Sequence, residues 1–403
     1  MLDAFLLFYF LILNYISSPS LKFLFFAHRQ KKIKGMTSKY SNFYPLQDRV
    51  QTRGRLYGLL PVITLFSIKN TALELTETKV DQLLQKVSSL KQEIQKVIVG
   101  QDIVLEEILV ALLAGGHCLL EGVPGLAKTL MVRTMAQALH LPFRRIQFTP
   151  DLMPTDIIGT EILEDDPVTG KRIFTFTRGP IFANILLADE INRTPPKTQS
   201  ALLEAMQEFE VTYAGKTYLL DRPFFILATQ NPIEQAGTYP LPEAQLDRFL
   251  LYVKIGYPSE QEEIEILANT TGTRKNKVLP VVNGDEIRQL QSLVREVSIN
   301  DDLTAYAGKL VRATRPDTTT LPFVKEWVRW GAGPRAGQAL ILTAKARALL
   351  YGRYAVTTED IHSMAYPVLR HRILMNFKAE AEGISSDKVT DELIKAIERP
   401  RAL

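Results

Sequence analysis

The segment Gly122-Val123-Pro124-Gly125-Leu126-Ala127-Lys128-Thr129 constrains the fold more than any other part of this sequence. It follows a short apolar run, residues 117–120, that is typical of a buried strand, and it precedes residues 130–139, whose composition suits a helix. A glycine-bearing loop between a strand and a helix points backbone N–H groups at an anion, which also meets the positive end of the helix. The segment therefore predicts a phosphate-binding loop.

Two side chains of the loop would complete the phosphate site. Lys128 would reach the β- and γ-phosphates, and the Thr129 hydroxyl would ligate magnesium. The strict pattern has glycine at the position of Ala127, and alanine fits there if this residue has right-handed helical geometry. The alternative is an ordinary strand-to-helix turn with a chance lysine. The candidate phosphate-contacting residues are Gly122, Val123, Pro124, Gly125, Leu126, Ala127, Lys128, Thr129 and Leu130.

Downstream of the loop, apolar runs alternate with helical patterns, as in a parallel sheet with crossover helices. Further strands are expected over residues 143–148, 185–190, 224–229 and 250–255. Two hairpins are expected as insertions between these elements, formed by residues 160–163 with 173–177 and by residues 211–213 with 217–219.

The third expected strand ends in two carboxylates, Asp189 and Glu190. They would lie at the carboxyl edge of the sheet, where ligands of open α/β folds bind. Asp189 would hold hydrated magnesium, and Glu190 would polarise the attacking water as a general base. An acidic pair alone is often only a solvated strand end, but in the same sheet as Lys128 it indicates a nucleotide site.

Two further polar residues are candidates for catalysis. Asn231 follows the fourth strand and could orient water or sense the γ-phosphate, although a turn residue before Pro232 is an equal alternative. Arg248 precedes the fifth strand and could complete a neighbouring subunit's site as an arginine finger. A surface salt bridge with Asp247 is the alternative for Arg248.

These motifs resemble the AAA+ ATPases of the MoxR family, through residues 122–129, 185–193, 228–232 and 241–249. The resemblance, in which an alanine at position 127 is usual, implies an α/β fold: a P-loop AAA+ αβα sandwich with sheet order 5-1-4-3-2. It also implies β-hairpin insertions of the helix-2-insert clade, a following all-α lid domain, and binding of ATP and Mg²⁺. Homo-oligomers, typically hexamers, and a von Willebrand A domain protein as partner are further implications.

The carboxyl-terminal part reads as helical from Ser259 onward, without strands. Helices are expected over residues 259–269, 285–297, 301–314, 338–351 and 358–369. Ser259 with Glu262 forms a capping box, and Thr358 is expected to start the last helix. By resemblance, Arg335 is the lid arginine that contacts the γ-phosphate. The basic residues Arg370, His371 and Arg372 are expected at the surface.

The chain divides into four parts: an extension over 1–35, a linker over 36–77, a nucleotide-binding domain over 78–258 and the lid over 259–403. Helical spacing begins at Thr78. The apolar segment at Val99 and Gly100, just before the P-loop domain, can fold over an adenine ring, which makes both residues candidates for nucleotide binding.

Charge is distributed unevenly. Residues 1–58 hold nine Lys and Arg against two Asp, so subtracting their +7 from the total of +4 leaves −3 for the rest. This slightly acidic remainder argues against nucleic acid as a partner. The single Cys118 excludes an internal disulfide, and the five histidines show no zinc-ligand spacing.

Membrane contact is expected only through residues 1–35. Their apolar run, residues 4–13, is shorter than the roughly 20 residues of a spanning helix. An anchor, disorder and an upstream extension with Met36 as a start all remain open. In each case the rest of the chain is expected in the cytoplasm.

Together these features predict an oligomeric ATPase that remodels or matures protein partners. A magnesium-chelatase-like metal-insertion subunit and a DNA-directed motor share the same body and remain alternatives. A nucleotide-gated scaffold with little turnover is a third alternative, which Glu190 disfavours.

Overall fold

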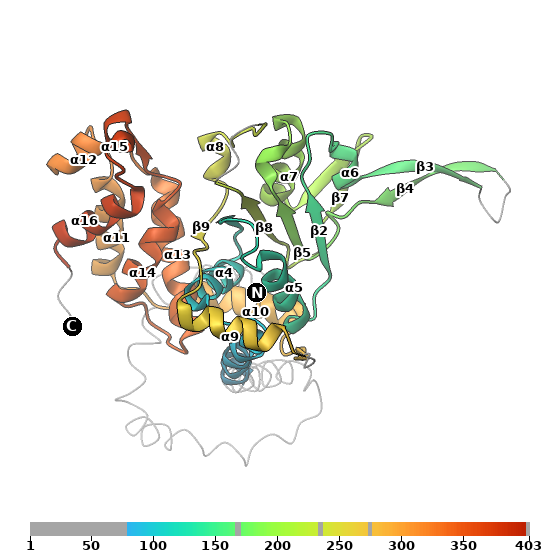
Figure 1. Cartoon of the computed structure of the whole chain (residues 1–403), viewed down its shortest axis with the longest axis horizontal. Coiled ribbons are helices and arrows are strands. Elements are labelled where there is room, and N and C mark those ends of the chain that lie inside the picture. Colours follow the sequence, from blue (N-terminus) through green and yellow to red (C-terminus); the bar gives the residue numbers. More distant parts are fainter. Residues whose placement is uncertain (1–78, 166–170, 233–236, 273–275, 400–403) are drawn as a thin grey trace, which may run out of the picture. The chain divides into compact units, whose positions relative to one another are not determined.

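The computed structural model describes residues 79–165, 171–232, 237–272 and 276–399. Its centre is a five-stranded sheet of parallel strands, ordered β2-β5-β8-β1-β9 (Figure 1). The strands are β1 (Cys118–Glu121), β2 (Phe143–Gln147), β5 (Ile185–Asp189), β8 (Phe225–Gln230) and β9 (Leu251–Lys254). Numbered along the chain, these five strands have the order 5-1-4-3-2, which confirms the predicted topology.

Helices cover both faces of this sheet. Alternate strand residues enter two separate cores, so that Cys118 and Leu120 of β1 belong to one core and Leu119 to the other. The first core also holds residues of α4 (Asp102–Ala114) and α5 (Lys128–Ala138), whereas the second holds residues of α7 (Pro196–Glu208). The expected αβα sandwich is therefore confirmed.

The two predicted hairpins are also present. After α6 (Pro154–Ile158), β3 (Gly159–Asp165) pairs with β4 (Arg172–Arg178), and the hairpin extends away from α6 in Figure 1. After α7, β6 (Glu210–Tyr213) pairs with β7 (Lys216–Leu219). Phe176 of the first hairpin stacks on Tyr218 of the second, with ring centroids 4.3 Å apart. The insertions therefore support each other.

The carboxyl-terminal part is mainly helical, but it contains two short strands where the sequence predicted none. β10 (Val328–Trp330) and β11 (Leu374–Met375) form an antiparallel ribbon. Strands of three and two residues are too short to show an alternating pattern. The helices are α9 (Glu260–Thr270), α10 (Gly284–Glu296), α11 (Asp301–Ala313), α12 (Pro322–Trp327), α13 (Pro334–Leu350), α14 (Thr358–Leu369), α15 (Phe377–Ala381) and α16 (Ser386–Ala396).

The helix caps explain two of these boundaries. Ser259 and Glu262 form the predicted capping box at α9. Helix α14 begins and ends as predicted, at Thr358 and Leu369, and Thr357 is its N-cap in a capping box with Asp360.

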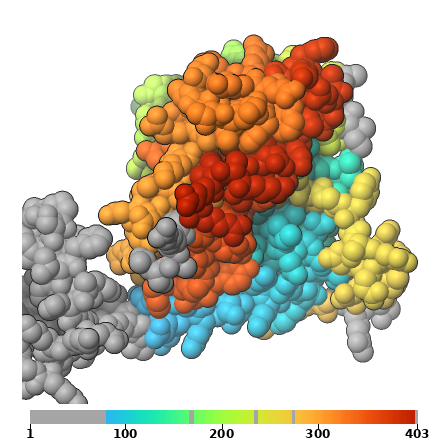
Figure 2. All heavy atoms as spheres, turned by 90° about the vertical axis from the view of Figure 1, so that its left-hand side faces the viewer, coloured from blue at the N-terminus to red at the C-terminus, as the bar shows by residue number. Residues whose placement is uncertain are grey.

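Helix α9 differs from its neighbours because none of its 11 residues is buried. It protrudes in yellow at the right-hand side of Figure 2, next to the segment in cyan. The helices of the carboxyl-terminal part attach to the nucleotide-binding part through α4, which packs against α13. Arg347 of α13 donates to Glu106 of α4 at 2.7 Å.

The expected extension over 1–35 and the linker over 36–77 lie outside the described residues. Among the helices that are described, none is long and apolar enough to cross a membrane.

Candidate functional site

The predicted phosphate-binding loop joins the carboxyl end of β1 to the start of α5. Two of its positions require glycine. A Cβ atom at Gly122 would lie 3.0 Å from both the side chain and the carbonyl oxygen of Ile255, just after β9. Gly125 has φ +88°, a conformation that residues with a side chain rarely adopt. The loop therefore passes close to the end of β9 before it turns into α5.

Ala127 departs from the expected geometry. Its φ of 53° and ψ of 22° are left-handed, so the prediction of a right-handed residue was wrong. For an L-residue with a side chain this conformation costs roughly 1–2 kcal/mol. No side chain caps α5 at this turn, and its first turn carries no acidic residue. The amide N–H groups of that turn are therefore suited to an anion.

Lys128 is the first residue of α5, and its Nζ donates to the carbonyl oxygen of Gly122 at 2.6 Å. Partial burial lowers the pKa of Lys128, and the charges of Asp189 and Glu190 oppose that shift. Strand β8 pairs in parallel with both β1 and β5, so the carboxyl ends of these strands, which lead to Lys128 and end in Asp189, lie at one edge of the sheet.

Asp189 ends β5 and is nearly buried, with 9% of the residue exposed. Its Oδ1 accepts a hydrogen bond from the Thr229 hydroxyl at 2.5 Å. Its Oδ2 accepts from Arg145 Nη2 at 2.6 Å. The carboxylate is therefore held by two neighbouring strands, β8 and β2, and has a fixed orientation toward the loop edge of the sheet.

Glu190 follows directly and has a left-handed backbone, with φ 59°. Its N–H donates to the Thr229 hydroxyl at 2.8 Å. Its Oε2 accepts from Gln147 Nε2 at 2.8 Å and pairs with Arg193 Nε at 3.1 Å. This turn separates the two carboxylates, which gives each of them its own set of partners.

Sequence reasoning missed Arg145, Gln147 and Thr229, which orient the two carboxylates. The strand order offers the signal that could have found them, because β2 and β8 flank β5. Gln147 pairs in register with Asp189, so polar residues near the end of β2 must face the acidic pair.

Asn231 and the Val99–Gly100 segment also lie near the loop. Asn231 is buried and follows β8, whose last residue pairs with Glu121 immediately before the loop. Gly100 has φ +67°, and a Cβ atom there would collide with Glu262 of α9. The adjacent Gln101 donates to the carbonyl oxygen of Gly256 at 2.9 Å. The segment therefore runs along the chain that leaves β9, close to the loop.

Arg248 lies at the amino ends of the strands, opposite the loop at their carboxyl ends. It precedes β9, and the next residue but one, Leu250, donates to His117 just before β1 begins. Arg248 Nη1 donates to the carbonyl oxygen of Leu203 on α7 at 2.9 Å. The structure therefore does not bring Arg248 to the loop of its own chain, which forms at the carboxyl ends of the strands.

Arg335 is grouped with the Arg248 segment. It lies in the first turn of α13, and its Nη1 is 3.6 Å from Asp247 Oδ2. The nearby basic residues also depart from expectation. His371 and Arg372 are buried, so their predicted surface location was wrong, and Arg370 is largely covered, with 14% of its side chain exposed.

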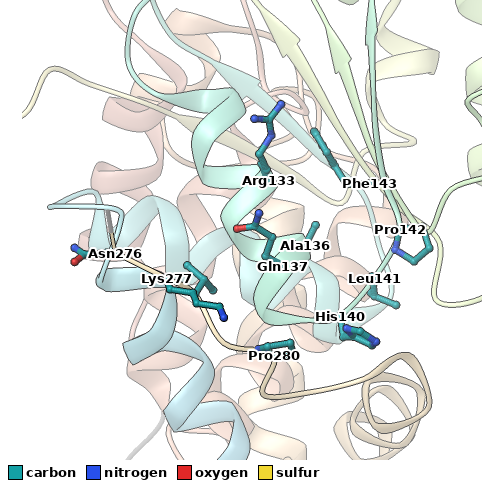
Figure 3. Close-up of a pocket in the computed structure, with 11 residues that line it drawn as sticks. Arg133, Ala136, Gln137, His140, Leu141, Pro142, Phe143, Asn276, Lys277 and Pro280 are labelled. Carbon is teal, nitrogen blue, oxygen red and sulfur yellow. The ribbon is translucent and has the colours of Figure 1, made fainter. Parts of the chain in front are cut away.

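A cavity of about 1110 Å³ lies at the other end of α5 from Lys128 (Figure 3). Arg133, Gln137 and His140 of α5 and its following turn line it, together with Lys277. Because the cavity lies at the carboxyl end of the helix, it is separate from the phosphate-binding loop.

The donor set suits hydrated Mg²⁺. No group of three or more His, Cys, Asp or Glu side chains among the described residues could enclose a metal. Mg²⁺ usually keeps several waters and takes one or two carboxylates together with substrate phosphates. Asp189, held in a fixed orientation, and the Thr129 hydroxyl provide ligands of this kind.

Comparison with known proteins agrees with this geometry. The family described as "ATPase family associated with various cellular activities (AAA)" matches residues 117–251, and "AAA lid domain" matches residues 323–393. A crystal structure from Cytophaga hutchinsonii, assigned as an ATPase, is 42% identical and has a TM-score of 0.76. The match covers 82% of this chain and 99% of that one.

Three relatives extend the similarity over most of the chain. Chaperone MoxR1 of Mycobacterium tuberculosis is 45% identical over 77% of this chain and 81% of its own length. YeaC of Bacillus subtilis is 44% identical over 77% and 93%, and the protein MoxR of Paracoccus denitrificans is 32% identical over 70% and 86%. With its sheet order, its loop and its lid, the chain therefore belongs to the MoxR family of AAA+ ATPases.

Proposed function

We propose that this protein binds ATP with Mg²⁺ and hydrolyses it to ADP and phosphate. The observation that carries the proposal is the grouping of Lys128, Asp189 and Glu190 at the carboxyl ends of the parallel strands. Phosphoryl transfer to water requires a cation, a carboxylate that binds the metal, and a second carboxylate that acts as base. Here these groups lie beside a helix start that has no side-chain cap.

Each group has a separate task. The first amide N–H groups of α5 and the Lys128 ammonium bind the phosphates. Thr129 and Asp189 hold Mg²⁺, which neutralises charge on the phosphate oxygens when bound. Glu190 accepts the proton of the attacking water. Asn231 orients that water, and Val99 and Gly100 contact the adenine.

The two arginines beyond the loop act between subunits in this proposal. Arg248 lies at the amino ends of the strands, whereas the loop lies at their carboxyl ends. An arginine there suits a neighbour's γ-phosphate in a head-to-tail ring, and a hexamer is the ring size proposed. Arg335 lies beside Asp247 in the same part of the structure, so we assign it to the same neighbouring site.

We further propose that hydrolysis drives remodelling or maturation of protein clients, with a von Willebrand A domain protein as partner. The name of the mycobacterial relative, Chaperone MoxR1, supports a chaperone-like role. Co-purification of the full chain with such a partner, increased by ATP and abolished in Lys128→Ala, would test this part.

The chemistry is tested by Glu190→Gln. Glutamine keeps the shape and cannot accept the proton, so kcat should fall by about 100-fold or more. Affinity for a fluorescent ATP analogue should be retained, because Glu190 is assigned to water and not to the phosphates. Lys128→Ala should instead weaken binding itself, since it removes the charge next to the loop.

A matched control is Glu296→Gln, the same change at the exposed carboxyl-terminal residue of α10. It should leave phosphate release at the wild-type rate. Unchanged turnover in Glu190→Gln would remove Glu190 from the mechanism. Turnover that persists in Lys128→Ala would show that the activity does not come from this site.

A further inference from the structure

A buried arginine from the helical part reaches residues 247–250. Arg372 lies in the turn between α14 and β11, and 8% of the residue is exposed. Its Nε donates to Asp247 Oδ1 at 2.7 Å. Its terminal nitrogens donate to the carbonyl oxygens of Phe249 at 2.9 Å and of Leu250 at 3.1 Å. One guanidinium therefore binds three of these four residues.

Arg372 therefore binds the residues on both sides of Arg248, since Asp247 precedes Arg248 and Phe249 follows it. The carbonyl oxygen of Phe249 also lies 3.0 Å from His371 Nε2, so two residues of the same turn hold it. The backbone on both sides of the proposed arginine finger is thus fixed by the helical part and not by the nucleotide-binding part alone.

The planar guanidinium is essential to this arrangement. A buried cation is unfavourable unless it is paired, and Arg372 meets one carboxylate and several carbonyl oxygens. Its fork of fixed N–H donors can serve acceptors in different directions, whereas lysine offers a single nitrogen. Lysine at position 372 would therefore keep the charge and lose part of the geometry.

Asp247 connects the second arginine to the same unit. Its Oδ1 accepts from Arg372, and its Oδ2 lies 3.6 Å from Arg335 Nη1. The side chain of Arg335 is 63% exposed, so it is available to a neighbouring molecule. One carboxylate therefore pairs with Arg335 and starts the segment that carries Arg248.

We propose that Arg372 is a positioning residue that presents Arg248 and Arg335 together to the ATP site of a neighbouring subunit. The inference rests on the proposed function, because it assumes that Arg248 completes a site across the ring. Arg372 itself touches no substrate in this scheme. Its effect on turnover passes through the placement of residues 247–250.

The first test compares Arg372→Gln with wild-type protein in steady-state ATP hydrolysis. A displacement of about 1 Å at a reacting group can cost about 100-fold in rate, so kcat should fall by roughly that factor. Affinity for a fluorescent ATP analogue should not change, because the subunit's own loop is intact. Arg372→Lys should recover part of the rate.

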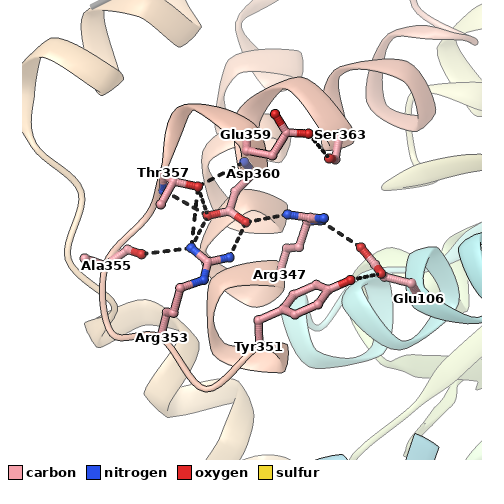
Figure 4. Close-up of polar contacts among 9 residues, drawn as sticks. All are labelled: Glu106, Arg347, Tyr351, Arg353, Ala355, Thr357, Glu359, Asp360 and Ser363. Carbon is pink, nitrogen blue, oxygen red and sulfur yellow. Dashed lines mark hydrogen bonds and ion pairs between the residues drawn. The ribbon is translucent and has the colours of Figure 1, made fainter. Parts of the chain in front are cut away.

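Arg353→Gln is the matched control. Arg353 is another ion-paired arginine of the helical part, and it binds Asp360 within that part (Figure 4). Its hydrogen bonds and ion pairs among the described residues do not reach residues 247–250, so its kcat should stay near wild type at a temperature where both variants are folded. If Arg372→Gln does not fold, Asp247→Asn provides a second variant with the same expected kinetics.

Mixing of variants distinguishes positioning from a general defect. Arg372→Gln keeps a working loop and Lys128→Ala keeps a working finger, so rings that contain both should recover turnover. Rings that contain Arg372→Gln and Arg248→Ala should not recover, because neither subunit presents a finger. A defect confined to the subunit's own site would give the reverse pattern.

The outcomes separate this inference from the function on which it rests. If wild-type turnover does not depend on Lys128, the proposed function fails and the inference fails with it. If turnover depends on Lys128 and on Arg248 but is normal in Arg372→Gln, only the inference is overturned. The inference is also overturned if Arg372→Gln recovers turnover when it is mixed with Arg248→Ala. It is overturned as well if neither mixture recovers turnover in rings that mass spectrometry shows to be mixed.

Discussion

Replacing Asp360 by asparagine tests how the helical part is fixed to the nucleotide-binding part. Asp360 is fully buried in the first turn of α14 (Figure 4). Its carboxylate accepts hydrogen bonds from Arg347 Nη1 at 2.7 Å and from both terminal nitrogens of Arg353, at 2.6 and 2.7 Å. Arg347 also donates to Glu106 of α4, so the network joins the two parts.

The expected loss follows from this geometry. Asparagine would leave two arginines facing a neutral amide. Because Arg353 is 36% exposed and Arg347 keeps its bond to Glu106, we expect a loss of about 1.5–3 kcal/mol. Burial alone would raise the pKa of Asp360, but hydrogen bonds, first from Arg353, outweigh it and lower the pKa. The folded pKa is thus below the unfolded one. The ionised network stabilises the protein at neutral pH, and its contribution disappears as the pH falls through the folded pKa.

The assay is urea denaturation of the full chain at pH 7, followed by circular dichroism. The control is Glu359→Gln, the same chemical change one residue earlier on the exposed side of α14. It should change the free energy of unfolding by no more than about 0.5 kcal/mol. A loss below about 1 kcal/mol for Asp360→Asn would refute the reasoning, since it would place the network among weak surface pairs.

Two other positions give simpler expectations. Ala127→Gly should raise the free energy of unfolding by about 1 kcal/mol, because glycine relieves the left-handed strain at φ 53°; a thermal melt in which the variant is less stable would contradict this. His117 is buried, its Nε2 lies 3.0 Å from the Met206 carbonyl oxygen, and burial lowers its pKa to about 4. Because the unfolded chain binds the proton more tightly, stability should decline by about 3 kcal/mol as the pH falls from 6.5 to 4. Urea titrations of His117→Gln over this range should show a smaller decline than wild type.

The sheet and the main site were predictable because their signals are local. The inner strands β1, β5 and β8 appear in the sequence as apolar runs, since they are covered on both faces. The edge strand β2 is mixed, with two arginines among its five residues. Lys128 follows one of the apolar runs closely, and Asp189 and Glu190 end another. Because carboxyl ends of parallel strands share one edge, the topology alone brings these residues together.

The partners of the site residues were not predictable in the same way. Arg145 and Thr229 contact Asp189 only because β2 and β8 are its neighbours in register, and nothing adjacent in sequence marks them. The left-handed geometry of Ala127 was missed for another reason. An alanine gives no sequence signal for positive φ, whereas a glycine would have done so.

The burial of His371 and Arg372 shows a further limit. A run of basic residues after a helix usually indicates a solvated turn, which is what the sequence predicts. Apart from the Asp247 carboxylate, their acceptors are backbone carbonyl groups, among them those of residues 249–250, and carbonyl groups are present at every residue and leave no pattern. Only the packing of α14 against β9 reveals the interaction.

Lys128 and Glu190 each have a hydrogen-bond partner within the protein, and this affects ATP binding and hydrolysis differently. Lys128 donates to the Gly122 carbonyl oxygen, and Glu190 Oε2 accepts from Gln147. When Lys128 binds a phosphate, it exchanges a hydrogen bond to a neutral carbonyl oxygen for one to a charged oxygen, and hydrogen bonds to charged groups contribute about 1.5–3 kcal/mol. Affinity therefore comes from Lys128 together with the uncapped N–H groups of α5. Glu190 adds little to affinity, because it is assigned to accept the proton of the attacking water, which happens after ATP is bound. Binding and hydrolysis thus depend on different residues, and substitutions should separate them.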